Sequence, residues 1–158
     1  MDTPVISTPK LAFAMQVQAE IGPPVDLGVM NGLRKRMIPI TGGSFEGPGI
    51  KGDVLPGGAD WQDIRPDGVA EILALYPLRT EDGVYINVRN PGFSHAAPGV
   101  LQKMVAGEPF NPNELYFRTT PQLSVAADSK YAWLGKTVFT GSATLHKGVV
   151  VLDFYAVK

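Results

Sequence analysis

Apolar and polar side chains alternate one by one along several segments of this chain. In Leu11–Glu20, apolar residues stand at every second position from Phe13 to Ala19, and polar residues alternate with them from Gln16 onward. A period of two residues is typical of a strand that buries one face. Further strands are predicted at 25–31, 37–41, 50–55, 69–79, 84–89, 115–120, 136–141 and 148–157.

Clusters of glycine, proline, asparagine and aspartate separate these segments and predict turns. They stand at Gly22–Pro24, Asn31–Gly32, Gly47–Gly49, Pro66–Gly68 and Glu81–Gly83. The pattern of about eight to ten short strands without an internal repeat indicates an all-β fold, and we expect a single antiparallel β-barrel. One short helix is predicted at 98–106, because Pro98 suits a first helical turn and Gly107 suits an end.

The segment Ile40–Trp61 carries seven of the eighteen glycines. Glycine is favoured where φ is positive or where another backbone comes close, so we expect a bulged strand–turn–strand that curls the sheet into a barrel. The segment has neither the Gly-Lys-Ser/Thr of a phosphate-binding loop nor a GxGxxG between strand and helix, which argues against nucleotide binding. We expect its last two residues, Asp60 and Trp61, to enter a cavity.

The composition indicates one folded domain over 1–158, with an irregular N-terminal arm at 1–9. Hydrophobic residues make up 44% of the chain and charged residues 18%, which is typical of a globular protein. A net charge of −1 offers no basic face for nucleic acid. The N-terminus does not resemble a secretory signal, and no segment approaches the roughly 20 apolar residues of a membrane helix, so we expect a cytoplasmic protein without nucleic-acid or membrane partners.

Few residues have the spacing of a known catalytic or metal-binding motif. There is no cysteine and no GxSxG motif, and the two histidines, His95 and His146, are predicted to lie in loops. No paired histidines or carboxylates have metal-ligand spacing, so we expect neither a metal nor a cofactor.

Asp60 is the first candidate for chemistry. Beside Trp61, its carboxyl could have the raised pKa that a general base needs, or it could simply cap a turn. Tyr116 and Arg118 share one strand face. If that face points inward, they supply an acid and a charge stabiliser; if it points outward, they are surface residues.

Other polar and aromatic residues leave two interpretations open. Arg79 lies close to Asp82 across a turn, and the two could pair with each other or Arg79 could bind a ligand. Tyr131 and Trp133 are two residues apart and would point to the same face of a strand, where they could line the cavity or pack in the core. The basic run Arg34–Arg36 is interpreted first as a solvated strand face and second as an anion site.

Several blocks of the sequence resemble the UPF0311/DUF3237 family over about 11–157. They are ITGGSFEGPGIKGDVLPGGADWQDIRPDG, LRTEDGVYINV, YFRTTP and KYAWLGKTVF. The resemblance implies a small, often oligomeric antiparallel β-barrel without an established general activity. The residues that match the family blocks are Asp60, Trp61, Arg79, Asp82, Tyr116, Phe117, Arg118, Tyr131 and Trp133.

The chain departs from that family pattern where polar residues are more usual, at 73–75, 123–125 and 133–135. These changes suggest either a cavity suited to a larger, more apolar ligand or the loss of a polar cluster.

Together these patterns predict a cofactor-independent enzyme that acts on a small, mostly apolar metabolite by isomerisation, cyclisation, or addition and loss of water. Asp60 would be the base, Tyr116 the acid and Arg118 the charge stabiliser. The predicted substrate-binding residues are Trp61, Arg79, Phe117, Tyr131 and Trp133. The alternative is a ligand-binding or carrier barrel without chemistry, and in either case we expect a homo-oligomer.

Overall fold

Eleven strands, one α-helix and two short 3-10 helices make up residues 2–158, the part of the chain that this computed structural model describes. The strands are β1 (Leu11–Ile21), β2 (Val25–Met30), β3 (Leu33–Gly47), β4 (Ile50–Val54), β5 (Gly58–Ile64), β6 (Ala70–Thr80), β7 (Tyr85–Ala96), β8 (Leu115–Thr119), β9 (Gln122–Val125), β10 (Phe139–His146) and β11 (Val149–Val157). The helices are α1 (Pro98–Ala106), η1 (Pro112–Glu114) and η2 (Ala132–Lys136).

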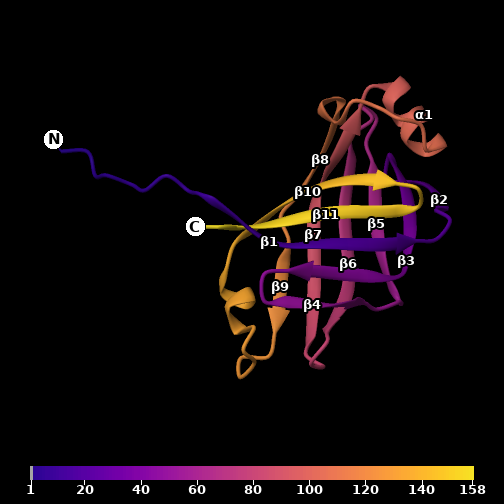
Figure 1. Ribbon diagram of the computed structural model, residues 1–158. Coiled ribbons are helices and arrows are strands. Elements are labelled where there is room, and N and C mark those ends of the chain that lie inside the picture. Colours follow the sequence, from indigo (N-terminus) through magenta and orange to yellow (C-terminus); the bar gives the residue numbers. More distant parts are fainter. Residues whose placement is uncertain (1) are drawn as a thin grey trace.

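These elements confirm the predicted all-β fold and the helix at 98–106. Of the predicted arm at 1–9, Met1 lies outside the described residues, and the rest has no regular secondary structure and extends away from the barrel (Figure 1). Among the described residues, no helix is long and apolar enough to cross a membrane.

Eight of the strands in residues 2–158 close into a ring. Going around the wall, β3 pairs with β1, and β11, β10, β8, β7, β6 and β5 follow before the ring returns to β3; every pairing is antiparallel. The three other strands extend the wall, since β2 pairs with β3, β4 lies between β3 and β6, and β9 pairs with β7. Helix α1 lies at one end of this barrel, away from β4 and β9 (Figure 1).

Three prolines stand where a long strand exchanges one neighbour for another. In β3, Pro39 lies between the last residue paired with β2 and the first paired with β1. Pro77 holds the same place in β6 between its pairings with β5 and β4, and Pro91 holds it in β7 between β9 and β8. Proline has no N–H to donate, so a gap between two partners is where a strand tolerates it.

Glycines of the 40–61 segment lie where φ is positive or another backbone comes close, as expected. Gly43 has a φ of 131° and lies in the middle of β3, where the strand crosses from β5 to β4. A Cβ at this position would collide with the carbonyl oxygen of Gln18 on β1. Two details differ from the prediction: 58–64 is a strand rather than the end of a glycine run, and β7 continues beyond Gly92 to Ala96.

The end of the barrel that carries β4, β9 and η2 is filled by apolar side chains. Its fully buried members include Leu78 and Ile86, with Leu134 of η2 packed against them. Burying each such side chain contributes about 1.5–3 kcal/mol, so this end supplies much of the stability. The other end, next to α1, is hollow.

Candidate functional site

A cavity of about 290 Å³ occupies the half of the barrel next to α1. One side of its wall is apolar and comes from β1, β3, β10 and β11. The residues of this side are Ala19, Ile21, Ile38, Ile40, Leu145, Val150 and Leu152. Leu101 and Met104 of α1 lie across the same space. Because inward and outward positions alternate along a strand, the pairs from β1, β3 and β11 are each two positions apart.

The opposite side of the cavity carries most of the polar groups, set among apolar residues such as Ile72 and Phe117. Four consecutive strands of the wall, β5 to β8, each place at least one polar side chain on it, among them Asp60, Tyr76, Asn90 and Thr119. In each of the four, an oxygen atom is buried without a hydrogen-bond partner among the described residues: Oδ1 of Asp60, the hydroxyl of Tyr76, Oδ1 of Asn90 and Oγ1 of Thr119. Since buried polar groups are normally paired, these four atoms are the ones that an ordered water or a bound ligand would pair with.

The pairing register explains why these groups meet. Asp60 lies opposite Ala74 on β6, and Ala74 lies opposite Asn90 on β7, so Asp60 and Asn90 stand in the same row across the barrel wall. Tyr76 is two residues further along β6, diagonal to Asp60, and lies beside Gly58. A Cβ on Gly58 would come within 2.5 Å of the Tyr76 Cβ. The glycine therefore makes room for the tyrosine in the wall.

Asp60 is held by a chain of hydrogen bonds from two neighbouring strands. Gln62 donates its Nε2 to Oδ2 of Asp60 at 2.8 Å. Arg36 on β3 donates to Oε1 of Gln62 from Nε at 3.0 Å and from Nη2 at 2.6 Å. Gln62 is only 7% exposed, and both Gln62 and Arg36 line the cavity.

The surroundings of Asp60 change its acidity. Burial raises the pKa of the carboxyl from 3.8 to about 6, although the hydrogen bond from Gln62, the charge of Arg36 and the backbone N–H of Leu73 act in the opposite direction. Burial, together with the negative charge of Asp60, also raises the pKa of Tyr76. At neutral pH, Asp60 is therefore a carboxylate basic enough to accept a proton, and Tyr76 is a neutral donor.

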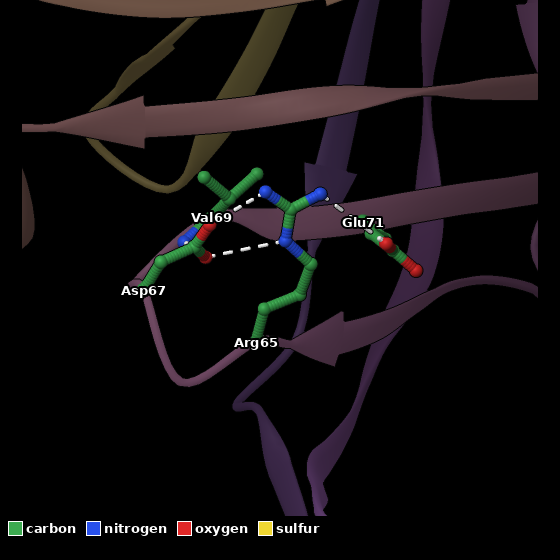
Figure 2. A network of polar contacts seen from close by, with 4 residues as sticks. All are labelled: Arg65, Asp67, Val69 and Glu71. Carbon is green, nitrogen blue, oxygen red and sulfur yellow. Dashed lines mark hydrogen bonds and ion pairs between the residues drawn. The ribbon is translucent and has the colours of Figure 1, made fainter.

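The turn between β5 and β6 forms part of the cavity rim and is fastened by ionic contacts (Figure 2). Arg65 donates to both carboxylate oxygens of Asp67, from Nη2 at 2.6 Å and from Nε at 3.2 Å, and its Nη1 lies 3.6 Å from Glu71. Asp67 also accepts the backbone N–H of Val69 at 3.1 Å. The bond from Arg65 lowers the pKa of Asp67 to about 2. These contacts hold Gly68, a lining residue, in place.

Two of the predicted site residues, Asp60 and Phe117, line this cavity. Trp61 follows Asp60 on a strand, so its side chain lies on the outer face, 46% exposed. Tyr116 and Arg118 flank Phe117 and also point outward. Tyr116 stacks on His95 with ring centroids 4.8 Å apart, and the guanidinium of Arg118 lies 5.9 Å from the Tyr116 ring. Tyr116 and Arg118 are therefore surface residues, the second of the two interpretations given above, and they do not lie next to Asp60.

The remaining predicted residues lie away from the cavity. Arg79 is exposed and lies 3.8 Å from Asp53 on β4, so the suggested pairing with Asp82 does not occur. Asp82 instead accepts the hydroxyl of Tyr131 at 2.9 Å, at the packed end of the barrel.

Trp133 is also outside the cavity and packs against Phe139 at a centroid distance of 6.1 Å.

Tyr76, Asn90 and Thr119 were not predicted from the sequence, and Arg36 was expected mainly on a solvated strand face. Asn90 could have been found from the sequence. It follows Ile86 and Val88 at every second position and is therefore a polar residue on the buried face of the strand. Within the described residues, no group of three or more His, Asp and Glu is placed to hold a metal ion.

The fold and the cavity define an antiparallel β-barrel with a ligand-sized, mostly apolar interior that carries a small group of polar side chains. The chain belongs to the DUF3237 family, described as a protein of unknown function, whose sequence pattern matches residues 9–157. This confirms the resemblance seen in the sequence.

Individual relatives agree with this membership. A UPF0311 protein of Rhodopseudomonas palustris (strain TIE-1) is 39% identical over 155 residues, which cover 98% of this chain and 99% of the relative. The crystal structure of a beta-barrel like protein from Acinetobacter baumannii AYE has a TM-score of 0.84 at 34% identity, covering 99% of this chain and 100% of its own. An enzyme from Penicillium herquei shares the fold with a TM-score of 0.74 at 20% identity, covering 99% of both chains.

Proposed function

We propose that this protein is a cofactor-independent enzyme that moves a proton on a small, mostly apolar molecule held in the barrel cavity. The observation that carries the proposal is the carboxyl of Asp60, a residue that lines a cavity of about 290 Å³ together with three other residues that each have a buried, unpaired polar atom. A base whose pKa lies near the working pH both accepts and returns a proton readily. A packed core would have filled this space with apolar side chains.

In the proposed step, Oδ1 of Asp60 removes a proton from a carbon next to a carbonyl group of the ligand. The electron pair of the broken C–H bond moves onto the carbonyl oxygen, where the hydroxyl of Tyr76 donates a hydrogen bond to the developing charge. Asp60, now protonated, returns the proton to another atom. Return to a different carbon isomerises the ligand, and return to a departing hydroxyl releases water. Attack of the carbanion on a second carbonyl closes a ring, and the proton then returns to the oxygen of that carbonyl.

The distribution of polar groups supports a ligand with an oxygen-bearing edge and an apolar body. The polar lining residues, apart from Arg36 on β3, come from β5 to β8, whereas apolar residues line the cavity from β1, β3, β5, β6, β8, β10 and β11. The volume is at the lower end of the range for ligand pockets, about 300–1,000 Å³, which favours a small metabolite. The fungal enzyme with the same fold supports the idea that such a barrel can hold an active site.

Proton abstraction can be tested without knowing the natural substrate. β-Tetralone, a small apolar ketone with acidic C–H bonds, is incubated with the protein in D₂O, and loss of its α-proton signals is followed by NMR. We expect saturable catalysis by the wild type and its loss in Asp60→Asn. Tyr116→Phe, on the outer face, serves as the matched control and should exchange at the wild-type rate.

The same experiment separates the enzyme from a ligand-binding or carrier barrel. If β-tetralone produces saturable shifts in the signals of cavity residues but no exchange above the rate in buffer, the protein binds without chemistry and the enzymatic proposal is wrong for this class of ligand.

We also propose, from the sequence, a cytoplasmic protein that self-associates. Light scattering during gel filtration checks the assembly, and fractionation of the source cells checks the location. A monomer across the micromolar range would contradict the first, and enrichment in a membrane or secreted fraction the second.

A further inference from the structure

The two carboxylate oxygens of Asp60 are not equivalent. Oδ2 accepts the N–H of Gln62 at 2.8 Å, whereas Oδ1 is buried with no hydrogen-bond partner in residues 2–158. A carboxylate free to rotate would present either oxygen to a ligand. The hydrogen bond to Gln62 restricts that rotation and leaves Oδ1 as the oxygen whose bonding capacity is unused.

The orientation of the Gln62 amide is in turn set by Arg36. A guanidinium group has only donors, so the oxygen that receives its two bonds must be Oε1, and the NH₂ group must point the other way, toward Asp60. The two bonds from Nε and Nη2 suit the fork geometry of arginine and not a single ammonium group.

We propose that Arg36 and Gln62 are positioning residues for Asp60: Arg36 locks the Gln62 amide, and the amide holds Oδ2 so that Oδ1 exchanges the proton with the ligand. This inference rests on the proposed function, because it assigns Asp60 the proton-transfer role.

The neutral amide between the two charges has a second consequence. A direct Arg–Asp ion pair commonly lowers a carboxyl pKa by 1–3 units, which would leave Asp60 a poor base. With Gln62 interposed, the cation orients the carboxylate without pairing with it, and the effect of burial on the pKa of Asp60 dominates. The other titratable side chains that line the cavity are Tyr76 on β6 and His95 at the rim on β7.

The chain provides a matched control for the charge of Arg36. Its neighbour Lys35 carries the same charge on the same strand but points outward, where its Nζ lies 2.9 Å from Asp63. Strand alternation therefore divides one basic run into a residue inside the cavity and a residue outside it.

The test is a double-mutant cycle read by the pKa of Asp60, measured from the ¹³Cγ shift of labelled aspartate. We expect Gln62→Leu and Arg36→Met each to raise this pKa by roughly half a unit to one unit, because each removes an interaction with the charged form. If Arg36 acts through Gln62, Arg36→Met should raise the pKa less than half as much in the Gln62→Leu background as in the wild type. An equal or larger rise there, or no rise in the single variants, overturns the proposal. Lys35→Met should leave the pKa unchanged.

A measurement on the wild type keeps the test valid if Gln62→Leu does not fold. The side-chain amide ¹⁵N signal of Gln62 should shift with the same midpoint as the Asp60 carboxyl, and independent midpoints would refute the proposed hydrogen bond. The β-tetralone assay is a separate readout. If Asp60→Asn abolishes ketone exchange but the effects of the two variants on the pKa are additive, only the positioning role is refuted. If the effects are non-additive but the wild type catalyses no exchange, only the enzymatic function is refuted.

Discussion

Replacing Asp60 with asparagine should stabilise the protein, and the gain should grow with pH. Asparagine has nearly the same shape and can still accept the N–H of Gln62, but it cannot ionise. The folded wild type must instead hold a carboxylate whose Oδ1 is buried without a partner. Because burial disfavours the charged form, ionisation at this position costs folding free energy.

The size of the effect follows from proton linkage. The pKa of Asp60 is about 6 in the folded protein and 3.8 as its ordinary value, so between these values the folded state holds more protons than the unfolded state. The free energy of unfolding of the wild type therefore falls as pH rises from about 4 to 6 and stays low above that range. A difference of about two pH units corresponds to about 3 kcal/mol, or roughly 6–12 °C in Tm for a domain of this size.

Urea unfolding of wild type and Asp60→Asn at pH values from 4 to 8 measures this directly. The difference between the two proteins should rise by about 2 kcal/mol between pH 4 and pH 8 and level off near neutrality. Asp63→Asn is the matched control, since Asp63 lies on the same strand but faces outward toward Lys35, and its difference from the wild type should not grow in this way. A difference between wild type and Asp60→Asn that is constant or shrinks with pH would refute the burial argument.

Three further variants separate the cavity from the packed end of the barrel. Tyr76→Phe removes a hydroxyl with no partner in the described residues, so stability should change by less than about 1 kcal/mol while ketone exchange slows roughly a hundredfold; unaltered exchange would contradict its role as a donor. Gly58→Ala brings a Cβ against the side chain of Tyr76, and thermal unfolding should show a loss of about 1–3 kcal/mol, whereas an unchanged Tm would argue against this packing. Tyr131→Phe deletes the hydrogen bond to Asp82 far from the cavity, which should cost about 1 kcal/mol in urea unfolding and leave exchange intact; lost exchange would place Tyr131 in the site after all.

The sequence predicted the barrel because strand alternation and turn residues are local properties. It could not predict which parity faces the interior of β8, since Leu115, Phe117 and Thr119 alternate with Tyr116 and Arg118 and both sets contain aromatic and polar residues. The register with β7 and β10 decides that question, and register depends on residues far away in the chain.

The pair Asp60 and Trp61 shows a second limit. We expected both in the cavity, on the assumption that a glycine-rich loop delivered them. They stand instead in the middle of strand β5, where consecutive side chains must point to opposite faces. Tyr76 could not be chosen beforehand, because its hydroxyl becomes notable only when the surrounding strands leave it unpaired.

The pH dependence of ketone exchange tests the role of Asp60 most directly. If Asp60 is the base, the rate catalysed by the wild type should rise with pH through a single midpoint at about 6, stay constant above it, and vanish in Asp60→Asn. Exchange that persists in Asp60→Asn with the same midpoint would show that another group removes the proton.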